Sequence, residues 1–136
     1  IKQFRPPTGK FIIELPAGLV DKDEPISTAA LRELKEETGY IGTVADESIE
    51  SIFGMAISST TCKIVTVEID GDKPENINPK QHLEDGEYAE VISIPLYNMM
   101  PYLEEYKQKG CGIDAKLIMM AVGMNVMKYA QKKSSL

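Results

Sequence analysis

The sequence predicts a single α/β domain with a mixed sheet and helices on its faces. Short apolar, β-prone runs alternate with segments of helical periodicity, in the order strand, helix, strands and two helices. No internal repeat or low-complexity tract is present. A length of 136 residues with 43% hydrophobic residues suits one packed core. We therefore expect residues 1–136 to form one domain.

The first predicted element is a β-hairpin. Residues 11–15 form an apolar, β-prone run that Pro16 stops, and residues 2–5 form a short strand before two prolines. We expect these segments to pair through a turn at residues 7–10. Residues 2–5 should lie at the edge of the sheet, because proline is tolerated mainly at edges.

A long loop and a helix follow the hairpin. Residues 16–26 contain proline, glycine and several acids but little periodicity, and long loops in compact domains are usually functional. Residues 27–38 have a helical pattern, with Ser27 as a suitable N-cap and Gly39 as a suitable C′ residue. The sequence thus predicts a functional loop directly before a helix.

The rest of the chain is predicted to supply two strands and two helices. These are strands at residues 62–69 and 90–94, and helices at residues 96–109 and 114–132. In the last helix, Met120, Met124 and Met127 lie at i, i+4 and i+7. This spacing indicates a face that packs in the core and does not bind a cofactor.

The composition excludes several classes of function. A formal net charge of −6 gives the surface no attraction for a nucleic acid polymer. No apolar run is long enough to span a membrane, and the N-terminus lacks the order of a signal peptide. Cys62, Cys111 and the single histidine, His82, do not suit a zinc site or a disulfide framework. We expect a soluble, intracellular protein of the cytoplasm or nucleus.

One face of the predicted helix carries a cluster of acids. Glu33, Glu36 and Glu37 lie at i, i+3 and i+4, so their carboxylates share a face. Like charges at this spacing cost about 0.2–0.5 kcal/mol per pair, and two of them lie near the negative end of the helix dipole. On spacing alone, a solvated acidic face partly neutralised by Arg32 and Lys35 is favoured over a metal site.

A longer motif that contains these acids reverses that preference. The chain runs Gly18-x5-Glu24-x7-Arg32-Glu33-Leu34-x-Glu36-Glu37-x-Gly39-Tyr40. This resembles the signature of Nudix hydrolases, G-x5-E-x7-R-E-U-x-E-E-x-G-U, in which U is aliphatic. Tyr40, at the final aliphatic position, is the sole departure. The resemblance implies the Nudix fold, an α/β/α sandwich with a mixed central sheet, and hydrolysis of a nucleoside diphosphate derivative.

The resemblance also implies a site for a divalent cation, Mg²⁺ or alternatively Mn²⁺. Carboxylates on one rigid helix suit Mg²⁺, because this ion takes oxygen ligands and usually keeps several waters. Arg32 would pair with Glu24 and orient the helix and loop, a supporting role in catalysis that could equally be described as structural. The implied metal ligands are Glu33, Glu37, Glu36 and the main-chain carbonyl of Ala17.

Further segments resemble the branch of this superfamily that hydrolyses ADP-sugars. They are Gln3-Phe4-Arg5-Pro6-Pro7, Glu14-Leu15-Pro16-Ala17-Gly18 and Asp85-Gly86-Glu87. The implied substrate is a small-molecule nucleotide sugar, ADP-ribose or a similar ADP-sugar, cleaved to AMP and a sugar phosphate. Without the resemblance, a surface role and a binding role explain Arg5 equally well. Glu14 could contact metal or substrate, although a carboxylate at a strand end is commonly only exposed. The implied substrate contacts are Arg5, Glu14, Gly18 and Leu19.

The polar segment at residues 71–86 is long enough to fold over a substrate, and the resemblance assigns the catalytic base to Glu87 at its end. Glu84 and Asp85 are local competitors. Without the resemblance, each of these three acids is better explained as a solvated loop carboxylate. His82 is chemically suited to act as a base, but a lone histidine in a polar loop ranks below Glu87.

Two other functions stay open. One is a Nudix hydrolase for an oxidised nucleotide or a dinucleotide, and the other is a catalytically silent module that binds a nucleotide sugar or another protein. The intact acidic cluster favours an enzyme, because a silent module has no chemical need for it. ADP-sugar hydrolases usually begin with an N-terminal β region that contacts adenine and helps form a dimer, and this chain starts near the end of that region. We expect a homodimer in the full-length protein.

Overall fold

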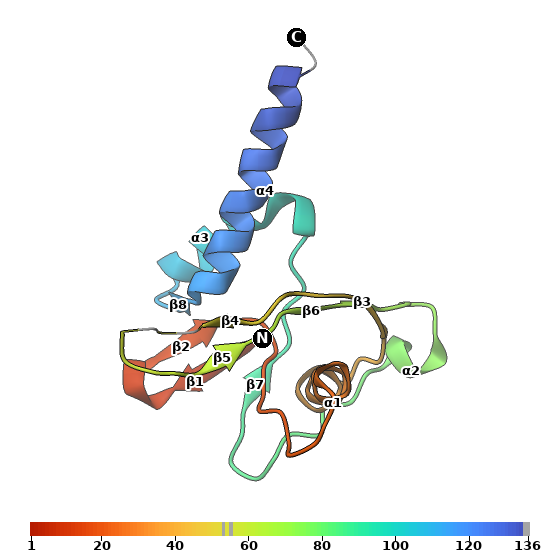
Figure 1. Ribbon diagram of the computed structural model, residues 1–136. Coiled ribbons are helices and arrows are strands. Elements are labelled where there is room, and N and C mark those ends of the chain that lie inside the picture. The colour runs from red at the N-terminus through yellow and green to blue at the C-terminus, as the bar shows by residue number, and fades with distance from the viewer. Residues whose placement is uncertain (53, 55, 135–136) are drawn as a thin grey trace. The chain divides into compact units, whose positions relative to one another are not determined.

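The structure is a computed structural model that describes residues 1–52, 54 and 56–134 (Figure 1). The chain falls into two compact units. The first consists of Ile1–Leu15 together with the residues from Glu84 onward, and the second is Pro16–Leu83. The α/β class with a mixed sheet is confirmed. One domain over residues 1–136 stays a prediction.

The first unit contains the mixed sheet. Its strands are β1 (Lys2–Arg5), β2 (Lys10–Ile13), β7 (Ala89–Glu90) and β8 (Gly112–Ile113), in the order β7-β1-β2-β8. β1 is antiparallel to β2 and β7, whereas β2 and β8 are parallel. The hairpin is confirmed, with the 3-10 helix η1 (Pro6–Thr8) at its turn.

Two predictions about these strands are wrong. β1 is an inner strand, because β7 pairs with Lys2 and Gln3, ahead of the two prolines that follow the strand. Proline therefore removes no hydrogen bond from this ladder. The strand predicted over residues 90–94 is limited to β7, since the ladder with β1 pairs only Ala89 with Gln3 and Glu90 with Lys2.

Helices η2 (Leu96–Asn98), α3 (Met99–Gln108) and α4 (Ala115–Ser134) complete the first unit. Its core forms where Ile13 of β2 packs with Leu103 of α3 and with Leu117 and Ala121 of α4. Both C-terminal helices were predicted close to these bounds. In the described part of the chain, neither these nor the other helices combine the length and apolar character that crossing a lipid bilayer requires.

The predicted methionine face of α4 is largely wrong. Met124 packs against the core, but the side chains of Met120 and Met127 are 40% and 60% exposed. The buried stripe runs instead through Leu117, Ala121 and Met124. Met120 and Met127 lie about 60° to 80° around the helix axis from Leu117, on its flank.

The second unit combines two helices with two antiparallel strand pairs. These are α1 (Ile26–Thr38), α2 (Pro74–Ile77), β3 (Thr43–Glu47) with β6 (Val65–Glu68), and β4 (Ser51–Ile52) with β5 (Thr61–Cys62). The single strand predicted over residues 62–69 is wrong, because the chain leaves the ladder between β5 and β6. There the Ile64 N–H donates to Ser48 Oγ, and the Ser48 N–H donates to the Ile64 carbonyl, both at 2.9 Å.

α1 begins and ends by different means. Its N-cap is Pro25, whose carbonyl accepts hydrogen bonds from the N–H groups of Thr28 and Ala29 at 2.9 and 3.0 Å. The N-cap predicted at Ser27 is therefore wrong, because Ser27 already lies in the first turn. The predicted C-terminal glycine is confirmed. Gly39 has a left-handed φ of 77° and donates its N–H to the last turn.

Candidate diphosphate and metal site

Arg32 on α1 is the centre of a hydrogen-bond network. Its Nε and Nη2 donate to the two carboxylate oxygens of Glu24 at 3.1 and 3.0 Å. Its Nη1 donates to Glu33 and Glu36 at 2.7 and 3.2 Å, and Nη2 also donates to the Leu19 carbonyl at 3.0 Å. These bonds employ all five N–H groups of the guanidinium. The predicted pairing of Arg32 with Glu24 is confirmed, and the same side chain holds two of the predicted metal ligands.

The charges in this network stabilise one another. Hydrogen bonding to Glu24, and then to Glu33, raises the pKa of the Arg32 guanidinium. Hydrogen bonding from Arg32, and then from the Asp21 N–H, lowers the pKa of the Glu24 carboxyl. A bidentate arginine–carboxylate pair is a strong, charge-assisted contact with fixed geometry. The loop before α1 is therefore attached to the helix by an ion pair that persists into the acid range.

The same loop approaches α1 at Ala17 and Gly18. The Ala17 N–H donates to the Glu37 carboxylate at 2.9 Å, and a Cβ on Gly18 would overlap the Glu33 carboxylate. Gly18 has no positive φ, so what a larger residue would disturb here is the position of the Glu33 carboxylate and not the backbone conformation. The structure thus places Ala17 beside Glu37 through its N–H. The metal ligand assigned to the Ala17 carbonyl stays a prediction.

The donor set on α1 fits a divalent cation. The three carboxylates of Glu33, Glu36 and Glu37 offer the oxygen ligands that Mg²⁺ and Mn²⁺ prefer. The Arg32 guanidinium lies between Glu33 and Glu36 and marks a point where both carboxylates hold one positive charge. Glu37 is only 7% exposed, and a buried carboxylate needs a positive or hydrogen-bonding partner.

The described residues contain no set of three acid, histidine or cysteine side chains that already converge on one point. The contacts given above explain this. Glu33 and Glu36 turn toward Arg32, whereas Glu37 turns toward Ala17. The structure therefore brings the predicted ligands onto one face of one helix and divides their oxygens between two different partners.

The predicted substrate contacts divide between the two units. Arg5 and Glu14 belong to the first unit, where Arg5 Nε donates to Glu14 Oε1 at 2.8 Å across the hairpin. The Glu14 side chain is 11% exposed and that of Arg5 is 41% exposed, so the pair holds a half-exposed guanidinium in a set orientation. Gly18 and Leu19 belong to the second unit. Leu19 gives its carbonyl to Arg32 and exposes its side chain.

The candidate base, Glu87, lies in an exposed turn of the first unit. The Glu84 N–H donates to Glu87 Oε2 at 3.2 Å, and the Glu87 N–H donates to the Glu84 carbonyl at 3.0 Å. Gly86 permits this turn with a φ of 90°. These contacts join Glu87 to the main chain of Glu84, so the choice of base among Glu87, Glu84 and Asp85 stays open. His82, the other candidate base, contacts α1 through its main chain, where its N–H donates to the Glu36 carbonyl at 2.8 Å.

Sequence reasoning missed two residues that contact the end of α1 and the chain just after it. Gln81 Nε2 donates to the Glu37 carbonyl at 2.6 Å. Asn76, which is 4% exposed, exchanges hydrogen bonds with both main-chain groups of Ile41 at 2.9 Å. Both residues lie in a polar segment without periodicity, so no pattern could have distinguished them from solvated loop residues.

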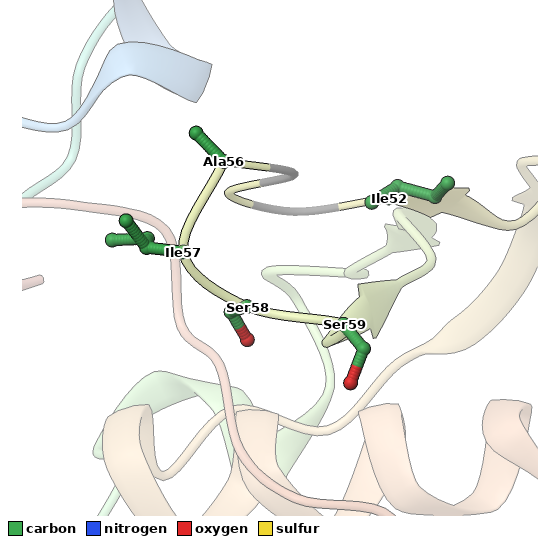
Figure 2. A pocket seen from close by; sticks show the side chains of 5 residues that line it. All are labelled: Ile52, Ala56, Ile57, Ser58 and Ser59. Carbon is green, nitrogen blue, oxygen red and sulfur yellow. The ribbon is translucent and has the colours of Figure 1, made fainter.

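An open pocket in the second unit lies beside β4 and the loop that leads to β5 (Figure 2). The residues that line it are Ile52, Ala56, Ile57, Ser58 and Ser59. Among the described residues of this lining none is charged, so they offer no carboxylate for a metal ion and no cation for a phosphate. The pocket shares no lining residue with the network around Arg32.

Comparison with known proteins places these observations in a family. The family model of the NUDIX domain matches residues 1–109. The chain is 47% identical over 129 residues to an uncharacterised Nudix hydrolase of Schizosaccharomyces pombe, covering 94% of this chain and 63% of that protein. It is 42% identical over 127 residues to an ADP-ribose pyrophosphatase of Saccharomyces cerevisiae, covering 93% of this chain and 55% of that protein.

An ADP-sugar pyrophosphatase of Mus musculus is 41% identical over 134 residues, covering 98% of this chain and 60% of that protein. The chain thus spans little more than half the length of the relatives it matches. The domain match covers most of the chain and includes the network around Arg32. The chain therefore belongs to the Nudix family.

Proposed function

We propose that this chain hydrolyses the diphosphate bond of ADP-ribose or a related ADP-sugar, giving AMP and a sugar phosphate, with Mg²⁺ or alternatively Mn²⁺. The observation that carries the proposal is the Arg32 network, which holds Glu33 and Glu36 on one face of α1. Nudix hydrolases generally need a divalent cation. Relatives named ADP-ribose pyrophosphatase and ADP-sugar pyrophosphatase support the class of substrate.

The proposed cation ligands are the α1 carboxylates and the Ala17 carbonyl. When bound, a divalent cation neutralises charge on the diphosphate and makes a water molecule more acidic. Arg32 keeps the loop against the helix, and Gly18 leaves room for the Glu33 carboxylate. The proposed ligands are Glu33, Glu37, Glu36 and the Ala17 carbonyl.

In the proposed reaction, the oxygen of water forms a bond to one phosphorus while the bridging P–O bond breaks. We assign the proton released from the water to the carboxylate of Glu87, with Glu84 and Asp85 as the alternative acceptors. Arg5, oriented by Glu14, would bind phosphate oxygens or the terminal ribose. Gly18 and Leu19 would contact the substrate from the loop. A homodimer and a cytoplasmic or nuclear location belong to the same proposal for the full-length protein.

The test measures AMP release from ADP-ribose with and without Mg²⁺. We compare the wild type with Glu37→Gln, which keeps shape but removes the charge, and with Glu104→Gln on an exposed position of α3 as control. We expect metal-dependent release that Glu37→Gln reduces by more than roughly tenfold and Glu104→Gln leaves unchanged. Release from an oxidised nucleotide or a dinucleotide, with none from ADP-ribose, would reassign the substrate. A folded chain that binds the metal and releases no product from any of them would contradict the proposed reaction.

A further inference from the structure

The C-terminal end of α1 is held by a later part of the chain. The last four carbonyls of a helix have no partner within it. Here the Glu36 carbonyl accepts the His82 N–H at 2.8 Å, and the Glu37 carbonyl accepts Gln81 Nε2 at 2.6 Å. Two consecutive residues outside the helix therefore bind the main chain of two consecutive proposed metal ligands.

We call Lys80–His82 the strap. It crosses the helix end at Gly39, where an added Cβ would collide with the backbone of Lys80. Gly39 also has the left-handed φ of 77° that ends the helix. A residue with a side chain would therefore be strained by conformation and would also push the strap away. Glycine at this position allows the main chain of the strap to lie directly on the helix end.

Asn76 fixes the chain shortly before the strap. Its buried side-chain amide accepts the Ile41 N–H and donates to the Ile41 carbonyl, both at 2.9 Å, and donates to the Asp70 carbonyl at 2.8 Å. Ile41 follows the Gly39 cap closely in the sequence. The segment is thus attached at the helix end and again just beyond it, so the strap has a defined position relative to α1.

The strap also acts where the electrostatics of α1 are least favourable. The C-terminal end of a helix carries partial negative charge, and Glu36 and Glu37 add two carboxylates there. The donors of Gln81 and His82 reduce the negative potential of the two carbonyls that they bind. They also fix the main chain from which both carboxylates project.

We propose that Gln81 is a positioning residue for the cation site of α1. Its amide holds the Glu37 carbonyl and so fixes the main chain from which the Glu36 and Glu37 side chains project. The carboxylates themselves are held by Arg32 and by the Ala17 N–H. The inference rests on the proposed function, in which these side chains bind a divalent cation. Gln81 does not itself touch the cation or the substrate.

The test is a titration of the chain with Mn²⁺, with free Mn²⁺ followed by electron paramagnetic resonance. Gln81→Met removes the amide donor and keeps an unbranched side chain of similar length. Gln108→Met makes the same change at an exposed position of α3 and serves as the matched control. We expect Gln81→Met to raise the Mn²⁺ dissociation constant roughly tenfold, the loss typical when a residue that positions a metal ligand is removed. The control should stay within about twofold of the wild type.

Thermal unfolding of each variant separates positioning from stability. A lower Tm in Gln81→Met with an unchanged Mn²⁺ dissociation constant would overturn the proposal, because the contact would then be structural. If Gln81→Met does not fold, Gln81→Lys supplies a donor on a stem of similar length. Mn²⁺ binding by Gln81→Lys within about threefold of the wild type supports the proposal, and a larger loss overturns it.

The same titration distinguishes this inference from the proposed function. Weaker Mn²⁺ binding in Gln81→Met, without hydrolysis of any ADP-sugar by the wild type, would leave the strap supported and the substrate wrong. Equal Mn²⁺ binding by the wild type and Gln81→Met, with normal AMP release by the wild type, would support the proposed function and contradict the role given to Gln81. A wild type that binds no Mn²⁺ overturns both.

Discussion

Helices α1 and α4 are held in place by different forces. α1 fully buries Ala29 and half-buries Leu31 and Leu34. Hydrogen bonds from Arg32 and Gln81 add contacts of defined direction. α4 is held by burial of Leu117 and Ala121, and much of its remaining apolar surface is exposed. Hydrogen bonds fix distance and angle, whereas apolar burial is non-directional. The helix that carries the candidate chemistry is thus the one whose placement is set by polar contacts.

The largest expected effect tests whether α4 is held by apolar burial. Leu117→Ala should lower the free energy of unfolding by about 2–5 kcal/mol, because it leaves a cavity beside a buried core. Met127→Ala should change it by less than about 0.5 kcal/mol, because that side chain is 60% exposed. Urea unfolding of both variants measures the difference. Similar losses for the two would show that Met127 is buried in solution.

The next effect tests the close approach of the loop to α1. Gly18→Ala places a Cβ where the Glu33 carboxylate lies, and the flexible carboxylate must move away from Arg32. We expect the Mn²⁺ dissociation constant to rise roughly tenfold with little change in Tm. Gly71→Ala is the control, because an added Cβ there meets no atom within 4 Å. Equal Mn²⁺ binding by the two variants would contradict the role given to Gly18.

The smallest expected effect concerns the stability of the fold at low pH. The pKa of Glu24 is lowered in the folded chain, so its ion pair with Arg32 stabilises the fold above the unfolded value near 4.5. This contribution disappears as the pH falls through the folded pKa. The Tm of the wild type should therefore exceed that of Glu24→Gln at pH 7, and the gap should close below about pH 4.5. A gap that does not narrow as the pH falls below about 4.5 would assign the effect to packing.

The candidate site was predictable where it depends on spacing within one element. The common face of Glu33, Glu36 and Glu37 follows from helix geometry, and the pairing of Glu24 with Arg32 follows from the family motif. The strap was not predictable. The Gln81 contact joins residues far apart in the sequence and depends on how the intervening chain folds.

The fold shows the same division. The hairpin was predictable because β1 and β2 follow each other in the sequence with only a short turn between them. β7 and β8 were not, because each has two residues and exists only through its pairing with β1 or β2. On α4, the sequence allows more than one apolar stripe, and only the contact with Leu103 and Ile13 decides which one is buried. Local periodicity therefore predicts where the longer helices and the hairpin lie. The pairing and packing partners decide where short strands form and which face of a helix is buried.

The order of the strands has a consequence for synthesis of the chain. The second unit is one continuous segment, Pro16–Leu83, inserted between the two halves of the first. The hairpin of β1 and β2 leaves the ribosome before β7 and β8, which follow only after that whole segment. Contacts that close such long loops form late and slowly. We therefore expect α1 and its loop to assemble while both edges of the hairpin still await their neighbouring strands.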